Sequence, residues 1–387
     1  MTIEPARRVQ AVPPSGIRKF FEIAEERDDV ISLGVGEPDF STPWAARDAA
    51  IASLERGRTS YTANRGMREL REAIAAYSAD RFDLTYDPDE EIIVTAGASE
   101  AVDLAFRAFV DPDDTVAIAQ PAYISYEPGV IFAGGEVLPV VTREEDEFRL
   151  TVDALETAGA ADADVLVLCY PNNPTGAVMG REDLAPVAEF AVSHDLTVFS
   201  DEIYAELTYE GEHTSIATFD GMRERTVVVN GFSKAYAMTG LRLGYALAPA
   251  AAVGAMNRIH QYGMLSAPTT AQYAALEALT SCDDDVEEMV GQYDRRRRFV
   301  RSRFEEIGMP CFEARGAFYV FPEVPPGWRG TADEFAEALL REQGVAVVPG
   351  TVFGEGGDGH LRVSYATGLE ELREALRRIG SFVDERC

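Results

Sequence analysis

Residues 226–249 read TVVVNGFSKAYAMTGLRLGYALAP, and this segment decides the fold. Its first part, TVVVN, is a nearly continuous apolar run, which is typical of a strand buried on both faces of a parallel sheet. A turn of small residues around Lys234 follows, and the apolar run LGYALAP ends the segment. Because ligands of open α/β sheets bind where strands end and loops begin, we expect Lys234 to lie at a binding site.

Strand-like runs recur on the N-terminal side of this segment, with helical patterns between several of them. The runs are EIIVTAG, TVAIAQPAY, GGEVLPVV, ADVLVLCYPNNP and LTVFSDEIY. The alternation predicts an α/β fold, with a mostly parallel sheet flanked by helices. We expect a large domain of residues 44–283 built around this sheet.

The character of the chain changes near Asp283. A long charged helix pattern leads into three short apolar runs, GAFYVFPE, GVAVVPG and HLRVSYA, and into a final helix pattern. These patterns predict a smaller α+β domain of residues 284–387, to which we add residues 1–43. The run of arginines at 295–298 lies amid acids, so we interpret it as a solvated or ion-paired helix face.

The chain of 387 residues is strongly acidic, with 66 acidic and 35 basic residues and a net charge of -31. Such a surface repels polyanions, so we exclude nucleic acid as a partner. Only two of the basic residues are lysines, Lys19 and Lys234. Molar salt shortens the Debye length to about 3 Å, which favours a protein adapted to high internal salt over an ordinary acidic enzyme.

Other sequence features narrow the class of protein. No apolar run is long enough to span a bilayer and the N-terminus lacks an apolar secretory signal, so we expect a cytoplasmic protein without a membrane partner. Four histidines occur without a His-x-x-x-His pair, and the four cysteines lie far apart. We therefore expect neither a disulfide framework nor a metal centre. The cysteines are Cys169, Cys282, Cys311 and Cys387.

Residues with chemical potential follow several of the apolar runs. Lys234 is followed eight positions later by Arg242, and a partly desolvated amine near a cation has a lowered pKa, so it can act as nucleophile and base. Asp201 directly follows LTVFS, although alone it could simply cap the following helix. The turn in TAGASEAVDLAF opens a helix whose N-terminus suits a phosphate. A surface lysine in a turn is the alternative for Lys234.

The segment GFSKAYAMTGLRLG resembles the attachment-site signature of the class I aminotransferases, the aspartate aminotransferase family of fold-type I pyridoxal-phosphate enzymes. The similarity extends from PPSG at residues 13–16 to the last helix. The resemblance implies that Lys234 carries pyridoxal 5'-phosphate as a Schiff base. It also implies a ping-pong transfer of the amino group of an L-amino acid to a 2-oxo acid such as 2-oxoglutarate, with Lys234 as acid and base.

The resemblance also assigns roles around the cofactor ring. Asp201 matches the carboxylate that keeps the ring nitrogen protonated, and Tyr204 matches a donor to the phenolic oxygen. Asn173, in PNNPTG, matches the second donor, although PNNPTG could be a turn without function. Tyr123, in QPAYISY, matches the aromatic residue that stacks on the ring, with core packing as its alternative.

Further residues match the phosphate site. The resemblance implies that the phosphate meets the amides of Ala98 and Ser99, the hydroxyl of Ser233 and the guanidinium of Arg242. The family often has serine where this chain has Gly231, so one phosphate contact is expected to be missing. Tyr61 matches a tyrosine that reaches the phosphate of a neighbouring subunit, which implies a homodimer with shared active sites.

The substrate site is implied by a strand near the C-terminus. In HLRVSYA, strand alternation puts Arg362 on one face with His360 and Ser364. The family assigns the substrate α-carboxylate to the residue at Arg362, helped by Gly36 and Asn173; a structural salt bridge is the alternative for Arg362. Some acid-preferring relatives have lysine where this chain has Ser99, which favours neutral or aromatic amino acids over strict aspartate specificity.

Three other functions fit parts of this pattern. A β-eliminating lyase could use the same fold and cofactor. A regulator that only binds the cofactor would resemble this chain fused to a DNA-binding domain, which the negative charge opposes. A nicotinamide oxidoreductase would need a dinucleotide fingerprint, but the Gly-x-Gly at residues 34–36 lacks the third glycine and a following helix.

Overall fold

The computed structural model describes residues 3–14, 16 and 29–387. Two parts of the sequence predictions lie outside the described residues: Ser15 of the PPSG motif, and residues 1–2 and 17–28 of the predicted small domain, which include Lys19. Within the described ranges, no helix has the length and apolar character needed to cross a membrane.

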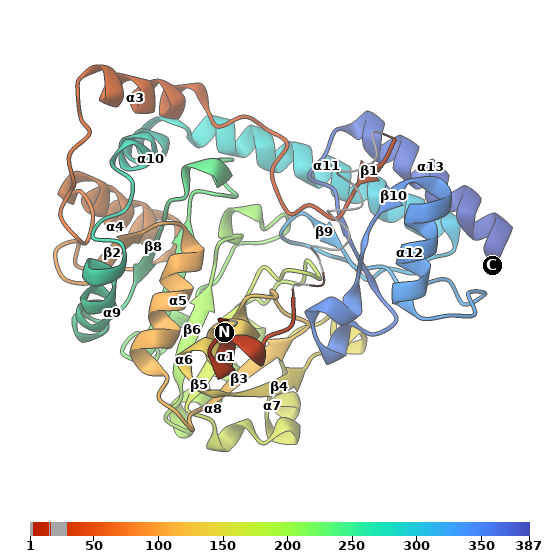
Figure 1. Cartoon of the computed structure of the whole chain (residues 1–387), viewed down its shortest axis with the longest axis horizontal. Coiled ribbons are helices and arrows are strands. Elements are labelled where there is room, and N and C mark those ends of the chain that lie inside the picture. The colour runs from red at the N-terminus through yellow and green to blue at the C-terminus, as the bar shows by residue number, and fades with distance from the viewer. Residues whose placement is uncertain (1–2, 15, 17–28) are drawn as a thin grey trace.

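A seven-stranded sheet forms the centre of the larger part of the molecule (Figure 1). Its strands lie in the order β2-β8-β7-β6-β5-β3-β4, and β8 alone runs opposite in direction to the other six. Each of the seven predicted apolar runs contains one of these strands, so the prediction of a mostly parallel sheet is confirmed. The strands are β2 (Ile92–Thr95), β3 (Thr115–Gln120), β4 (Glu136–Val141), β5 (Val165–Cys169), β6 (Thr197–Asp201), β7 (Thr226–Gly231) and β8 (Gly244–Leu247).

The sheet is buried on both faces, which explains why its strands read as continuous apolar runs. In β5, Val165, Val167 and Cys169 join one hydrophobic cluster, whereas Leu166 and Leu168 join another on the opposite face. Helices cover both faces. Those of the first cluster are α5 (Ala98–Phe109), α6 (Tyr126–Ala133) and α9 (Ala250–Gly263), and those of the second are α7 (Val152–Ala158) and α8 (Arg181–Ser193).

A third group of helices connects the central sheet to the rest of the molecule. The helix α10 (Thr269–Ser281) packs on α3 (Trp44–Glu55) and α4 (Arg68–Phe82). The hydrophobic cluster around them includes Ile92 of β2 and extends to Leu376 near the C-terminus. The two predicted domains therefore share one continuous apolar core, while the boundaries at residues 43 and 283 stay predictions.

The C-terminal part is an α+β arrangement around two small sheets (Figure 1). One is antiparallel in the order β11-β12-β9, and the other pairs β1 with β10 in parallel. The elements are β1 (Ile31–Ser32), α11 (Asp283–Ile307), β9 (Tyr319–Val320), α12 (Ala332–Gln343), β10 (Val345–Ala346), β11 (Val348–Pro349), β12 (Leu361–Ser364) and α13 (Leu369–Arg386).

The apolar run GVAVVPG is divided between two strands, β10 and β11. Val345 pairs with Ile31 of β1, whereas Val348 pairs with Arg362 of β12. The chain therefore leaves one sheet and enters the other within three residues. Local apolar character cannot reveal this division, because it depends on the strands with which the run pairs. The partner of Val345 lies more than 300 residues away in sequence, and that of Val348 about a dozen residues away.

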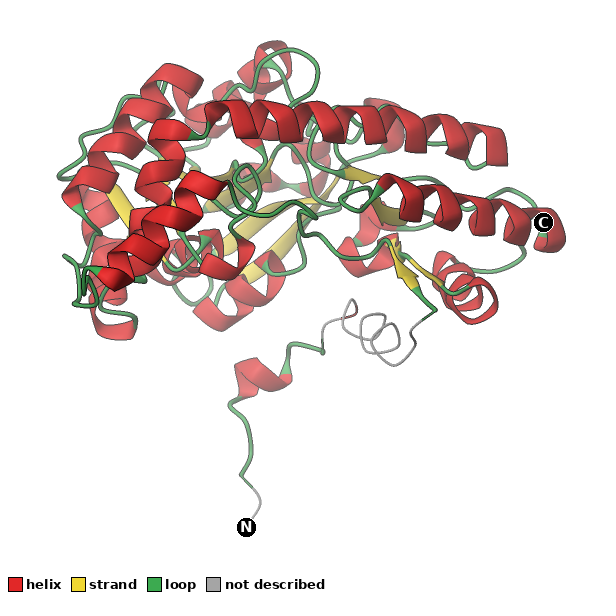
Figure 2. Ribbon diagram, turned by 90° about the horizontal axis from the view of Figure 1, so that it is seen from above, coloured by secondary structure: helices red, strands yellow, loops and turns green. Residues whose placement is uncertain are grey.

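The N-terminal segment divides between the two parts of the molecule. Residues 31–32 pair with β10 of the small part through β1. Further upstream, α1 (Arg7–Gln10) contacts α6 instead and buries none of its residues. Figure 2 shows α1 standing off from the layered body.

The arginine run at 295–298 is an ion-paired helix face, as its acidic surroundings predict. Arg296 lies 2.7 Å from Asp39, and Arg297 lies 2.6 Å from Glu210. Both arginines are buried, which the charged sequence does not suggest. Their ion pairs join α11 to loops distant in sequence.

Candidate active site

A cavity of about 990 Å³ opens at the carboxyl ends of β3, β5, β6 and β7. The position agrees with the rule for ligand sites in open α/β sheets. Most of the site residues predicted from the sequence line it. They are Gly36, Ala98, Ser99, Tyr123, Asn173, Asp201, Tyr204, Ser233, Lys234, Arg242 and Arg362.

Tyr61 is the predicted site residue that does not line the cavity of its own chain. Its side chain is 80% exposed. Its sequence neighbours are held near α10 by hydrogen bonds. The hydroxyl of Thr269, at the start of α10, donates to the carbonyl oxygen of Ser60, and Asn64 donates to the carbonyl oxygen of Leu265 just before the helix. An exposed tyrosine away from the cavity can serve an active site only if that site belongs to another chain.

Lys234 projects from the turn that follows β7. Its Nζ donates a hydrogen bond of 2.7 Å to the carbonyl oxygen of Gly36 and lies 5.8 Å from the ring centre of Tyr204. Burial, and after it the positive charge of Arg362, lowers the pKa of Lys234 to about 8, although Glu37 opposes this shift. A substantial fraction of this amine is therefore neutral in mildly alkaline solution and able to act as a nucleophile.

Asp201 ends β6 and is buried at the floor of the cavity. Its Oδ2 accepts a hydrogen bond of 2.7 Å from Tyr126, and its Oδ1 accepts one of 3.2 Å from the amide of Ile203. Burial raises the pKa of Asp201 to about 6, against the lowering effect of these two donors. A buried carboxylate of this kind favours a cationic partner in the cavity.

The N-terminus of α5 forms the anion-binding end of the cavity. Gly97 precedes the helix with φ of 85°, a left-handed conformation that favours glycine, and the helix has no side-chain cap. A Cβ at Gly244 would lie 2.4 Å from the amide nitrogen of Ala98, so glycine is needed for β8 to approach this turn. The first amides of α5 and the positive end of its dipole are thus available to an anion.

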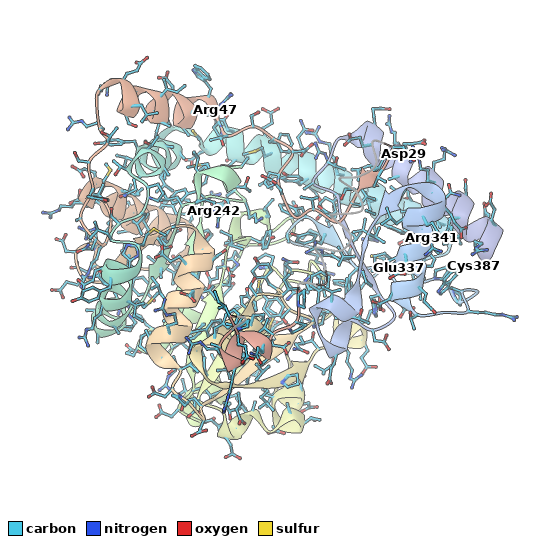
Figure 3. All side chains as sticks on the ribbon, viewed as in Figure 1. Asp29, Arg47, Arg242, Glu337, Arg341 and Cys387 are labelled. Atoms are coloured by element: carbon cyan, nitrogen blue, oxygen red, sulfur yellow. The ribbon has the colours of Figure 1, made fainter. Side chains whose placement is uncertain are left out.

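Arg242 adds a fixed positive charge to the same end (Figure 3). Its Nη1 donates to the carbonyl oxygen of Thr239 at 3.0 Å. Its Nη2 lies so near the helix start that a Cβ at Gly97 would come within 2.7 Å of it. Together with the nearby Ser233, the guanidinium and the helix terminus form a cradle suited to a phosphate dianion.

Position 231 requires glycine for a steric reason that the sequence does not reveal. An added Cβ would lie 2.9 Å from the Cα of Gly244 and 3.1 Å from the carbonyl oxygen of Leu243. These are backbone atoms of the paired strand β8 and cannot move cheaply. Glycine at position 231 is therefore required by the close pairing of β7 with β8.

Arg362 is buried in β12, and its guanidinium is held from several sides. Its Nη1 donates to Oδ1 of Asn173 at 2.9 Å and its Nη2 to the carbonyl oxygen of Gly34 at 2.5 Å. The rings of Tyr319 and Phe353 lie 4.6 and 4.8 Å from the guanidinium carbon. Burial lowers the pKa of Arg362, and none of the carboxylates among the described residues forms an ion pair with it.

The guanidinium of Arg362 therefore still has a hydrogen-bond donor to offer. Its Nε is buried without a hydrogen-bond partner in the described part of the chain. Since a buried cation needs a charged partner, the arrangement suits a carboxylate that enters from the cavity. This contradicts the alternative of a structural salt bridge for Arg362 among the described residues.

Two tyrosines of the site were missed by the sequence predictions. Tyr126 donates to Asp201, and Tyr319 shares a hydrogen bond of 3.0 Å with the hydroxyl of Tyr204. Tyr126 also packs edge-on against Tyr123, with ring centres 5.5 Å apart. Both missed residues stand in apolar runs where an aromatic residue reads as core, so the sequence carried no signal for them.

Comparisons with known proteins agree with this geometry. Residues 28–379 match the family described as aminotransferase class I and II. The chain belongs to this family. The chain is therefore an aminotransferase that uses pyridoxal phosphate, and its fold is that of the fold-type I enzymes.

Individual relatives extend over nearly the whole chain. YugH of Bacillus subtilis (strain 168), whose name gives the aminotransferase class without a substrate, is 51% identical over 97% of each chain. An aspartate aminotransferase of Pyrococcus abyssi (strain GE5 / Orsay) is 45% identical over 98% of each chain. The solved structure of an aromatic aminotransferase from Pyrococcus horikoshii OT3 is 44% identical, covers 95% of this chain and 99% of its own, and superimposes with a TM-score of 0.90.

The residues of this aminotransferase fit the cofactor of the family. The aldehyde of the cofactor needs an amine, which Lys234 offers. Its protonated pyridine nitrogen needs an anionic partner, which Asp201 offers. The phosphate needs an anion cradle, and the space kept open by Gly97 and Gly244 beside Arg242 provides one. All three features line one cavity.

Proposed function

We propose that Lys234 is the residue that binds pyridoxal phosphate covalently and that it is also the catalytic acid and base. The observation that carries this proposal is the gathering of an amine of lowered pKa, a buried carboxylate and an anion cradle around one cavity. Asp201 holds a proton on the ring nitrogen. Tyr204 and Asn173 donate to the phenolic oxygen, and Tyr123 covers the ring.

The phosphate is held by the amides of Ala98 and Ser99, the hydroxyl of Ser233 and the guanidinium of Arg242. When bound, pyridoxal phosphate withdraws electrons from the α-carbon of the amino acid. Nζ of Lys234, free of its covalent attachment, removes the α-proton as a general base and returns a proton as a general acid.

Substrate orientation depends on the small part of the molecule. We propose that Arg362 grips the α-carboxylate of the amino acid bidentately, with Asn173 and the backbone of Gly36 at its side. Asn173 already holds Nη1 of Arg362, so it fixes the plane of the guanidinium. This orientation brings the α-carbon toward Lys234 across the cavity.

The lining of the cavity supports neutral or aromatic amino acids as the preferred donors, with 2-oxoglutarate as acceptor. Apolar side chains such as Val35, Ile124 and Val352 line it, and so do the acids Glu37 and Glu127. The apolar groups favour an aliphatic or aromatic side chain on the amino donor. The named relatives include both aspartate and aromatic aminotransferases, so the donor has to be measured.

The scarcity of lysine gives a sharp test of the attachment site. Borohydride reduction of the holoenzyme in molar potassium chloride should leave a pyridoxyl adduct on Lys234, located by peptide mass spectrometry. Lys234→Ala should lose the adduct and turn over at least about a thousandfold more slowly, since general-base catalysis alone contributes about 10² to 10⁴. Lys19→Arg, the matched control at the other lysine, should keep both. An adduct that persists in Lys234→Ala would refute the proposal.

A panel of amino donors with 2-oxoglutarate tests the substrate. Aromatic and neutral donors should give higher kcat/KM values than aspartate, and the reverse order would overturn the substrate proposal. The same assay without acceptor addresses the β-eliminating lyase. Pyruvate and ammonia released at a rate comparable to transamination would establish that reaction instead.

We propose further that the working unit is a homodimer in which Tyr61 reaches the phosphate bound by the partner subunit. Exposed apolar side chains on α3 and α9 support an interface between chains. Trp44 and Leu54 of α3 are 62% and 55% exposed, and Tyr262 of α9 is 87% exposed. A hydrogen bond from Asn64 to the carbonyl oxygen of Leu265 joins the neighbouring segments.

Mixing two impaired variants tests the shared site. Lys234→Ala lacks the amine, and Tyr61→Ala should lower cofactor affinity. In a mixed dimer, one site would combine the intact Lys234 of one chain with the intact Tyr61 of the other. Recovery of high-affinity activity on mixing would support the arrangement, whereas a monomer in sedimentation experiments would exclude it.

We also propose that the enzyme works in the cytoplasm at high internal salt. The net charge of -31 supports this proposal, because self-repulsion of the surface weakens when salt screens it. Denaturant unfolding should give a midpoint that rises between low and molar potassium chloride. An unchanged midpoint would contradict adaptation to salt.

A further inference from the structure

Three side chains with metal-binding atoms meet away from the cavity. They are Glu144, Glu323 and His360, and one ligand atom of each lies within 4.8 Å of the others. Glu144 begins the 3-10 helix η1 (Glu144–Asp146), which follows β4 of the seven-stranded sheet. Glu323 follows β9 and His360 precedes β12 in the three-stranded sheet.

The imidazole of His360 is held rigidly. The residue is 8% exposed, and its ring stacks on Phe321 with ring centres 4.9 Å apart and an interplanar angle of 5°. The ring of Phe148 packs edge-on against it at 5.4 Å. His360 cannot turn away from the two carboxylates without breaking these contacts.

The hydrogen bond of the other ring nitrogen determines what His360 presents. Its Nδ1 lies 2.9 Å from the carbonyl oxygen of Asp358. A carbonyl oxygen only accepts hydrogen bonds, so Nδ1 carries a proton and Nε2 is the ring nitrogen that faces Glu144 and Glu323. In the tautomer protonated at Nδ1, Nε2 offers a lone pair, so this nitrogen and the two carboxylates together form a set of donor atoms for a cation.

The spacing between Nε2 and the carboxylate of Glu144 equals that of two ligands on one ion. Nε2 lies 3.4 Å from Oε2 of Glu144 and 4.0 Å from Oε1 of Glu323. The separation of 3.4 Å is at the long end for a hydrogen bond, whose N···O distance is mostly about 2.9–3.0 Å. Two ligands placed about 2.1 Å from a tetrahedral zinc ion lie about 3.4 Å apart.

We propose that Glu144, Glu323 and His360 bind a divalent cation that ties the loop after β4 to the three-stranded sheet. The mixed nitrogen and oxygen ligands suit zinc, with water completing the coordination, since the side chain of Glu323 is 46% exposed. His360 stands two residues before Arg362 in the chain. The ion would therefore also restrain the strand that carries the substrate-binding arginine.

Zinc binding to the holoenzyme tests the site. Equilibrium dialysis in molar potassium chloride, which suppresses diffuse binding to the acidic surface, should give one zinc ion per chain. Glu144→Gln and His360→Gln should each raise the dissociation constant at least tenfold. Glu145→Gln is the matched control, because it removes the same charge from an exposed neighbour in η1 and should bind zinc like the natural chain.

A second measurement separates loss of the site from loss of the fold. Zinc should raise the midpoint of thermal unfolding of the natural chain and of Glu145→Gln, but not that of Glu144→Gln. Retained absorbance of the bound cofactor would show that each variant is folded. Equal zinc affinity in Glu144→Gln and Glu145→Gln, or no zinc retained by the natural chain, would overturn the proposal.

Discussion

Replacing Tyr126 with phenylalanine tests how the buried carboxyl group of Asp201 is kept ionised. The hydroxyl of Tyr126 donates to Oδ2 of Asp201 at 2.7 Å, and the tyrosine is 1% exposed. A hydrogen bond to a charged group contributes about 1.5–3 kcal/mol, and one pH unit in a pKa corresponds to about 1.4 kcal/mol. The variant should therefore raise the pKa of Asp201 by about one to two pH units.

The direction of the effect on activity follows from the ionised state. Burial already raises the pKa of Asp201 to about 6, so the variant should titrate between about 7 and 8. An aspartate is ionised above its pKa, so the ionised fraction at neutral pH should fall from about 90% to about 10–50%. If the ionised carboxylate is required, kcat/KM should fall about twofold to tenfold at pH 7 and recover in alkaline solution.

The assay is the pH profile of kcat/KM for the natural chain, Tyr126→Phe and Tyr123→Phe. Tyr123 contacts the ring of Tyr126, whereas the two side-chain oxygens of Asp201 bond to Tyr126 and Ile203. Only Tyr126→Phe should move the acidic limb of the profile to higher pH. The reasoning would be refuted by a limb that coincides with that of the control, or by an equal loss of activity at every pH.

Three further outcomes are expected. Because the pKa of Lys234 is lowered to about 8, incorporation of pyridoxal phosphate into the apoenzyme should accelerate as pH rises and reach half its maximal rate near that value; a half-maximum near about 10, as for an ordinary lysine, would contradict the burial argument. Gly231→Ser should lower the free energy of unfolding in denaturant titrations by about 1–3 kcal/mol, since its Cβ would lie 2.9 Å from the Cα of Gly244. Gly240→Ser, with no atom within 4 Å of its Cβ, should change stability little, and equal losses would exclude the steric explanation. Arg362→Lys should lower kcat/KM for amino acids about tenfold to a hundredfold in steady-state kinetics, since lysine lacks the planar fork of the guanidinium. Its affinity for the cofactor, measured by titration, should change little. Parallel losses of kcat/KM and of cofactor affinity would contradict a role in substrate binding.

Much of the catalytic centre could be predicted from the sequence because its residues stand at the ends of apolar runs. A buried strand is apolar throughout, so its end is visible where polar or small residues begin. Lys234 and Asp201 follow such runs directly, and parallel strands bring their carboxyl ends to one edge of the sheet. Local sequence therefore determined both the chemistry of these side chains and their common location.

The same reasoning fails for residues whose role depends on a distant partner. Tyr126 and Tyr319 stand in apolar surroundings, and only the tertiary structure brings their hydroxyl groups to Asp201 and Tyr204. The smallness of Gly231 could be read from the sequence, but its cause, the approach of β8, could not.

The proposed zinc ligands could likewise not be predicted from the sequence. Spacing along the chain predicts no metal centre, because Glu144, Glu323 and His360 are far apart in sequence and follow no ligand motif. Folding places them within 4.8 Å of one another by joining a loop of one sheet to two strands of another. The sequence by itself determined which strands form and which chemistry ends them, since both depend on neighbouring residues. Only the tertiary structure decided which distant side chains meet, because packing between sheets and helices, and not spacing along the chain, sets those distances.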